Sequence, residues 1–113
     1  MSTGRTLYRI SVNVPEEFLE RMMDAVTDAV RPVHPGYERT FSYSPVTGTW
    51  RPLEGSSPYR GTVGRIETAE EIRLEFAVGE KDLKDAVRAV ADIHPYEEPA
   101  IDVIPMTDWK DLL

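Results

Sequence analysis

Hydrophobic and polar residues alternate in two stretches of this chain, residues 7–14 and residues 72–78. A period of two is typical of a β-strand with one buried face. Each stretch is followed by acidic residues and then by apolar positions at helical spacing, which predicts helices over residues 16–30 and 80–93. The chain therefore contains the same strand–helix pattern twice.

Pro32 and Pro35 end the first predicted helix and Pro95 ends the second, and a His-Pro pair follows each helix, His34-Pro35 and His94-Pro95. Proline cannot continue a helix, so each pair marks an exit. A closing strand is predicted over residues 100–104. Two tandem strand–helix–strand units predict an α+β fold, a ferredoxin-like sandwich with both helices on one face of the sheet.

The segment between the two units predicts an extended central hairpin. A second strand is expected over residues 40–44, and Thr47-Gly48 predicts a turn into a third strand over residues 49–53. Residues 51–61 are rich in Pro, Gly and Ser but also contain Tyr, Leu and Arg, which favours an ordered, irregular loop over a linker.

The length of 113 residues predicts one domain, residues 1–113, with a core over residues 7–106. Residues 107–113 form an amphipathic C-terminal tail, which we expect to cover a sheet edge or a neighbouring subunit. Met22 and Met23 lie on the apolar side of the first helix, where methionine is usually core filler.

Charge and cysteine content exclude several kinds of function. The formal charge is −7, from 20 acidic and 13 basic residues, so neither nucleic acid nor a membrane surface is an expected partner. The chain has no cysteine, which excludes disulfides, thiolate metal sites and Cys nucleophiles. No apolar secretory core or membrane-length run is visible, so we expect a cytoplasmic protein.

Four segments carry a family resemblance. They are Gly48-Thr49-Trp50-Arg51-Pro52-Leu53-Glu54-Gly55, Pro58-Tyr59, Gly61-Thr62-Val63-Gly64 and the run from His94-Pro95-Tyr96-Glu97-Glu98-Pro99 to Val103. This pattern resembles the insert domain of YqfO proteins, members of the Nif-three-like family, and short free-standing relatives of that insert. The insert is similar in fold to CutA, the divalent-cation tolerance protein, and to the P-II signalling proteins.

The resemblance implies a trimer, because CutA and P-II proteins are trimers whose strands join across subunits. In full-length relatives a separate core domain carries a two-metal site, and nothing in this chain matches that core. Hydrolytic activity of the metal core is therefore not implied here. Family members often carry His or Cys on the second strand, whereas this chain reads Thr40-Phe41-Ser42-Tyr43 there.

His94, Glu97 and Glu98 form the first candidate site. An imidazole with nearby carboxylates could supply part of a nitrogen-and-oxygen site for a divalent metal ion, or contact another ligand. The alternative is structural, because His94 continues the apolar side of the second helix and could cap its last carbonyls. His34 and Glu38 are a weaker echo in the first unit, and one site shared by both histidines is a further alternative.

Arg51 and Glu54 flank Pro52-Leu53 in the central loop. The arginine could hold a carboxylate or phosphate through two parallel hydrogen bonds. The alternative is an ion pair of Arg51 with Glu54, Glu97 or Glu98 that locks the loop, across a subunit interface in the case of Glu97 and Glu98. Gly55, Gly61 and Gly64 would allow a ligand to approach the backbone. Trp50 and Tyr59 in or beside the same loop favour an interface or a pocket wall.

Catalysis has little support in the sequence. No serine has a histidine-plus-acid partner by motif, no Gly-x-Ser-x-Gly elbow is present, and the glycines form no phosphate loop. The first hypothesis is a non-enzymatic oligomeric binding or regulatory module, with a small-ligand or metal site near subunit interfaces built from Arg51, Glu54, Tyr59, His94, Glu97 and Glu98. The second is a CutA-type divalent-metal-binding protein, and the third is a small enzyme acting on a metabolite.

Overall fold

The computed structural model describes residues 4–113, and within them the strand–helix pattern predicted twice is present twice. Short 3₁₀ turns over residues 16–18 and 80–82 lead into the two helices, where Glu16 and Glu80 lie in the first turn. The elements are β1 (Leu7–Val14), α1 (Leu19–Ala29), β2 (Ser42–Trp50), β3 (Glu67–Gly79), α2 (Leu83–Ile93) and β4 (Ile101–Met106).

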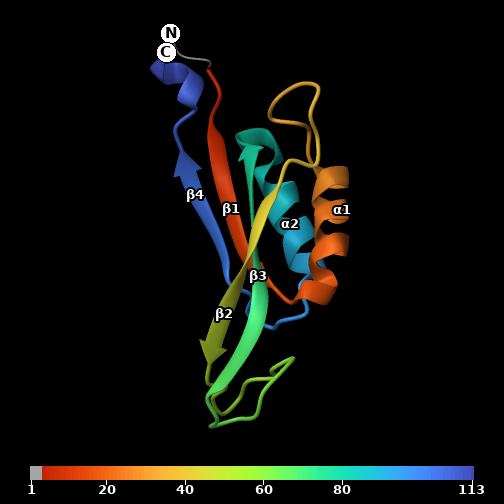
Figure 1. Cartoon of the computed structure of the whole chain (residues 1–113), viewed down its shortest axis with the longest axis vertical. Helices are drawn as coiled ribbons and strands as arrows, with labels where there is room; N and C mark the ends of the chain where they lie inside the picture. Colours follow the sequence, from red (N-terminus) through yellow and green to blue (C-terminus); the bar gives the residue numbers. More distant parts are fainter. Residues whose placement is uncertain (1–3) are drawn as a thin grey trace.

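The strands form one antiparallel sheet in the order β2-β3-β1-β4. Both helices cover one face of this sheet, run in opposite directions and leave the other face open (Figure 1). This is the ferredoxin-like α+β fold predicted from the tandem units. The order places β2 and β4 at the two edges, and one hydrogen-bonding side of each has no strand partner among the described residues.

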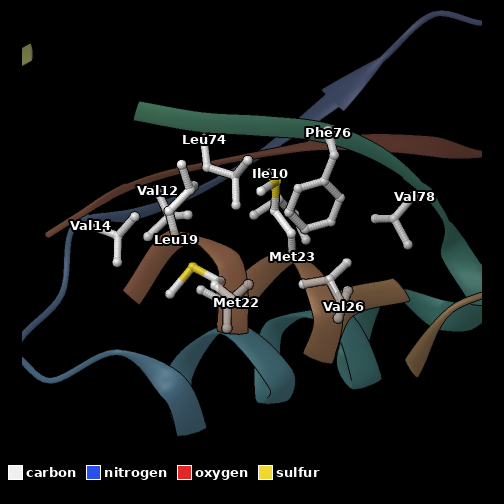
Figure 2. Packing of buried hydrophobic residues seen from close by; sticks show 12 residues of the cluster. Ile10, Val12, Val14, Leu19, Met22, Met23, Val26, Leu74, Phe76 and Val78 are labelled. Atoms are coloured by element: carbon white, nitrogen blue, oxygen red, sulfur yellow. The ribbon is translucent and has the colours of Figure 1, made fainter. Parts of the chain in front are cut away.

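The core lies between the sheet and the helices (Figure 2). Alternate residues of β1 and β3 face α1, which contributes Leu19, Met22, Met23 and Val26. Met22 is fully buried and Met23 nearly so, as expected for core filler. The sheet side of the core consists of Ile10, Val12, Val14, Leu74, Phe76 and Val78.

The central hairpin differs from the prediction of two short strands joined at Thr47-Gly48. β2 is a single strand that continues through both residues, and all nine of its residues pair with β3. The predicted strand over residues 49–53 therefore does not exist as a separate element. The pairing is possible because β3 begins at Glu67, five residues before the apolar alternation that predicted it.

The early start of β3 creates a two-stranded extension of the sheet. Residues 72–79 of β3 pair with β1, whereas residues 67–71 pair only with β2. The face of β3 that is buried also changes there. Leu74 is buried on the face that the helices cover. Glu71 lies three positions earlier and is therefore buried on the opposite face of the strand. The segments that cover Glu71 form the candidate functional site.

The C-terminal tail is held against the start of the chain. Asp108 is 3 % exposed and accepts from Arg5, with 2.7 Å between Nη2 and Oδ2, while Trp109 and Leu112 in the following 3₁₀ turn are exposed. That this tail covers a partner subunit stays a prediction, as do the domain limits. Within residues 4–113, no helix is both long and apolar enough to cross a membrane.

Candidate functional site

A pocket of about 490 Å³ opens beside the two-stranded extension. Its walls are drawn from the end of β2 and the following loop, residues 48–53, 56 and 58–60, and from residues 96–98 and 100 between α2 and β4. Asn13 at the end of β1 and Glu71 on β3 complete it. The site therefore joins segments from both tandem units, which local sequence patterns could not bring together.

The β2–β3 loop is tied down at several points. The Trp50 indole nitrogen donates to the Arg60 carbonyl at 3.2 Å, and the amide of Ser57 donates to the Glu97 carboxylate at 3.1 Å. Tyr59 packs edge-on against Phe18 before α1, with ring centroids 6.2 Å apart. These contacts hold the loop against the helical layer, so the pocket wall is formed before any ligand arrives.

Aromatic rings gather around Tyr96. Its ring centroid lies 6.0 Å from that of Trp50, 5.8 Å from that of Tyr59 and 4.8 Å from that of His94. Such rings give a pocket rigid, largely apolar walls at little entropic cost. Trp50 and Tyr59, for which the sequence predicts an interface or a pocket wall, both line this pocket, and the interface alternative stays a prediction.

Glu71 is the most unusual residue of the pocket. Glu71 is only 6% exposed. Within residues 4–113, its carboxylate nevertheless forms no ion pair and no hydrogen bond of standard length and angle. Oε1 lies directly against Gly48, where any Cβ would overlap it. Buried carboxylates are normally paired, because an unpaired buried charge is costly.

The hydroxyl of Tyr96 is the second unsatisfied group. It is buried and has no hydrogen-bond partner among the described residues. Burial, followed by the neighbouring Glu71 carboxylate, raises the pKa of Tyr96 to about 12. The carboxylate is thus close enough to favour the neutral phenol, although the pair falls outside the geometry of a formed hydrogen bond.

His94 has a structural role beneath the pocket. It ends α2, where its own amide donates to the Val90 carbonyl at 3.0 Å. Nδ1 accepts from the Tyr96 amide at 3.2 Å, so Nε2 carries the proton and donates to the Asn13 carbonyl at 2.6 Å. Burial lowers the pKa of His94, consistent with a neutral ring.

The predicted site residues are only partly brought together. Arg51, Tyr59, Glu97 and Glu98 all line the pocket, whereas the exposed Glu54 does not. Arg51 makes no ion pair or hydrogen bond with any residue that the structure describes. The alternative pair of Arg51 with Glu54 is therefore not formed among the described residues, whereas pairing with Glu97 or Glu98 across a subunit interface stays a prediction.

The two histidines lie far from each other. The helices run in opposite directions, so His34 after α1 and His94 after α2 are at opposite ends of the helical layer (Figure 1). His34 borders a different pocket of about 320 Å³. The fold therefore offers no single site shared by both residues within one protomer.

Metal coordination by His94 stays a prediction from sequence. Among residues 4–113, no three His, Asp or Glu side chains come together as metal ligands. Both ring nitrogens of His94 are also occupied, since Nδ1 accepts a hydrogen bond and Nε2 holds a proton. A metal ion would have to displace one of these bonds.

The glycines contribute differently from what the sequence predicted. Gly55, Gly61 and Gly64 adopt positive φ angles and shape the loop, but none of them lines the pocket. Gly48, which was expected to form a turn, is the glycine that lines it and gives Glu71 its place. The close approach that requires glycine is therefore made by a carboxylate of the same chain.

Sequence reasoning missed Glu71 and gave no separate role to Tyr96. Tyr96 lies inside the His-Pro-Tyr-Glu-Glu-Pro run, so its motif was a usable signal. Glu71 directly precedes the apolar alternation of residues 72–78, and this alternation predicts a strand that begins only after Glu71. Only the pairing of β3 with β2 shows it to be a buried strand residue.

Comparison with known proteins finds sequence relatives of this chain. No protein-family model matches the chain. Curated relatives named GTP cyclohydrolase 1 type 2 homolog align with most of it, at 35% identity over 116 residues in Halalkalibacterium halodurans and 33% over 99 residues in Staphylococcus epidermidis strain RP62A. These alignments cover 99% and 88% of this chain but only 30% and 27% of the relatives.

Solved structures agree with the sequence relatives. A Bacillus cereus protein related to NIF3 superposes with a TM-score of 0.80 at 29% identity, covering 95% of this chain and 27% of the other. The periplasmic divalent cation tolerance protein CutA from Archaeoglobus fulgidus gives 0.68 at 19% identity, covering 95% and 91%. Bacillus subtilis GlnK gives 0.63 at 12% identity, covering 90% and 86%. The last two likenesses concern the fold alone.

Proposed function

This chain is a relative of the NIF3-related proteins and has the fold of CutA and P-II proteins, and on that premise we propose that it is a non-enzymatic binding module. It acts in the cytoplasm as a homo-oligomer, with a trimer favoured, and takes a small anionic ligand into the pocket beside β2. The activity of the much longer relatives is not part of the proposal, since the chain spans under a third of their length.

One observation supports a ligand site above all others. The pocket combines preformed aromatic walls with charged and polar groups that lack partners among the described residues, namely Arg51, Glu71 and the Tyr96 hydroxyl. Ligand sites are mostly apolar hollows with a few convergent polar groups, and this pocket has that composition. Arg51 is exposed and free to bind a ligand, whereas Glu71 and the Tyr96 hydroxyl are buried, where polar groups without partners are rare.

The arginines favour an anion at the pocket mouth. Arg51 has no partner among the described residues, and Arg60 has a loose pair with Glu17 at 3.7 Å and lies over the ring of Tyr59. Guanidinium groups bind carboxylates and phosphates in a planar, two-pronged geometry. Glu71, Glu97 and Glu98 line the same pocket, so an anion is expected only at the end that Arg51 and Arg60 border.

The sheet edges support assembly. β2 and β4 both have an unpaired side, and β4 exposes Val103 and Ile104, 42% and 47% exposed. Exposed apolar edge strands are prone to pair with another chain. A trimer that joins such edges agrees with the expectation from CutA and P-II proteins, and it would place the pocket, which borders the edge strand β2, near a subunit boundary.

The divalent-metal alternative has weaker support. It relies on His94, whose two ring nitrogens are already engaged with Asn13 and Tyr96. Glu97 is likewise engaged with the Ser57 amide. A metal ion would have to break these contacts, whereas an anion at Arg51 would break none.

Native mass spectrometry of the gently purified protein tests the proposal, because it reports assembly and bound mass together. We expect a trimer with a reproducible extra mass that is lost in Arg51→Ala. Arg65→Ala is the matched control, since Arg65 lies in the same loop but does not line the pocket.

Either of two results would overturn the proposal. A monomer without extra mass removes both the assembly and the ligand. An extra mass that survives Arg51→Ala but disappears on treatment with a metal chelator favours the divalent-metal alternative instead.

A further inference from the structure

We propose that the ligand of this pocket carries, besides its anionic group, a cationic or strongly N–H-donating group that binds the Glu71 carboxylate. An amidine, a guanidine or an amino-substituted heterocycle has the required chemistry, with two N–H donors side by side. This inference rests on the proposed function, since it describes the second end of the same bound molecule.

The first support is the state of Glu71. An ionised carboxylate has about four lone-pair positions to satisfy, and burial removes the water that would otherwise fill them. Glu71 is only 6% exposed, yet no cationic side chain within residues 4–113 forms an ion pair with its carboxylate. The position therefore suits a donor that comes from outside the chain.

The second support is the direction in which Glu71 is held. Oε1 lies against the Cα of Gly48, so the strand backbone blocks that side of the carboxylate. Gly48, Glu71 and Tyr96 all line the pocket, so the carboxylate borders the hollow that a donor would enter. A donor entering the pocket would reach the carboxylate without displacing any formed bond.

The third support is the partner beside it. One phenol O–H can donate to at most one lone-pair position of the carboxylate, so Tyr96 alone cannot satisfy the hydrogen-bonding capacity of Glu71. The aromatic walls formed by Trp50, Tyr59 and Tyr96 suit a flat, delocalised cation, which gains from contact with ring faces as well as from the carboxylate. An amidinium or guanidinium would also bind the carboxylate through two parallel hydrogen bonds.

Two poles of opposite charge thus face one hollow. Arg51 supplies the positive pole at the loop and Glu71 the negative pole on β3. The pocket volume of about 490 Å³ is within the range of sites for small metabolites. A molecule with an anionic group and an amidine-like group at separate ends would match both poles, whereas a simple dianion would meet repulsion at Glu71.

Benzamidine is the probe for the Glu71 end, because its amidinium presents two parallel N–H donors on a ring that fits aromatic walls. We expect saturable binding at millimolar concentrations in NMR titrations of the amides, with the largest shifts at Gly48, Glu71 and Tyr96. Benzamide, the neutral molecule of the same shape, should bind at least about tenfold more weakly, because a charge-assisted pair is lost.

Glu71→Gln should weaken benzamidine binding by about tenfold or more. Glu70→Gln is the matched control, since the neighbouring Glu70 is exposed and its side chain contacts Thr47. Glu70→Gln removes the same charge from the same strand and should leave binding unchanged, which separates the local pair from general attraction to an acidic protein.

Equal binding of benzamidine to the wild type and to Glu71→Gln, or no saturable binding, would overturn this inference. If the Arg51-dependent bound mass is still seen in that case, the proposed binding function stands and only the second pole is wrong. If neither is seen, both fail.

Discussion

At one end of the helical layer His94 is 7% exposed, with both ring nitrogens bonded, while at the other end His34 is exposed beside Tyr37. Each histidine precedes a proline and follows a helix of eleven residues. The same dipeptide therefore has a structural role at one end and a surface position at the other. The two histidines differ because other segments of the chain cover His94 and leave His34 exposed.

The two ends also differ in how their charges are satisfied. Near His34 the pocket of about 320 Å³ is bordered by arginines that already have acidic partners, with Arg31 paired to Asp82 at 2.9 Å and Arg9 to Glu75 at 2.8 Å. Near His94 the larger pocket is lined by the exposed Arg51 and the buried Glu71, and neither has such a partner among residues 4–113. A buried charge without a partner is the rarer case, and it favours a site for an outside ligand.

The largest expected difference between the ends is in stability. His94→Ala should lower the free energy of unfolding by about 2–4 kcal/mol, because it leaves a cavity and deprives the Asn13 carbonyl and the Tyr96 amide of their partners. His34→Ala should change it by less than about 0.5 kcal/mol, as for other exposed positions. Urea unfolding of both variants measures this, and equal losses would contradict the comparison.

Two glycines near opposite ends of β3 give the next contrast. Gly48→Ala should cost about 1–2 kcal/mol, because its Cβ would overlap the Glu71 carboxylate and force a buried side chain to move. Gly79→Ala meets open space and should cost no more than about 0.5 kcal/mol. If the overlap is the cause, Gly48→Ala should cost much less in a Glu71→Ala background, which a double-mutant cycle in urea would show.

Replacing the buried carboxylate of Glu71 should raise the free energy of unfolding, whereas the substitutions above lower it. Glu71→Gln keeps the shape but removes an unpaired buried charge, so we expect the free energy of unfolding to rise by about 1 kcal/mol. Glu70→Gln, on the exposed face, should stay within about 0.5 kcal/mol of the wild type. A clear loss of stability in Glu71→Gln would mean that the fold itself supplies a partner for the carboxylate.

The smallest effect is a pH dependence at the His94 end. Burial lowers the pKa of His94 in the folded chain, and protonating Nδ1 would also remove the acceptor for the Tyr96 amide. The folded state thus binds a proton less readily than the unfolded chain, whose histidine pKa is about 6.5. The stability contributed by neutral His94 is complete above that value and is lost as the pH falls through the folded pKa.

Urea midpoints measured between about pH 7.5 and pH 5.5 should therefore fall as the pH is lowered. His94→Gln, which keeps an N–H donor but cannot titrate in this range, should reduce that slope. Removing the other histidine, in His34→Gln, should leave the wild-type slope in place. An unchanged slope in His94→Gln would assign the pH dependence to other groups.

Much of the fold was predictable because its signals are local. The alternation in β1, the apolar side of α1 and the prolines after each helix each depend on residues close together in sequence. The hairpin was predicted less well, since Thr47-Gly48 has the composition of a turn. Pairing with β3 overrode that local preference and kept β2 continuous.

The site was predictable only in part for the same reason. Arg51, Tyr59, Glu97 and Glu98 were selected from motifs, and all four line the pocket. Glu71 could not be found that way, because an acid before an apolar strand is ordinarily a solvated residue. Its burial depends on contacts between segments that are far apart in the chain.

The sequence by itself determined the two strand–helix units, the helix ends and the acidic character of this protein, because periodicity, proline and charge act over a few residues or by simple addition. Only the tertiary structure decided which His-Pro pair is buried, where β3 begins and which charges face the pocket. Those features depend on the β2–β3 loop folding against the segment after α2, a contact between residues about forty positions apart, such as Ser57 and Glu97. The energy of such a contact belongs to the packed chain, and no single segment of the sequence records it.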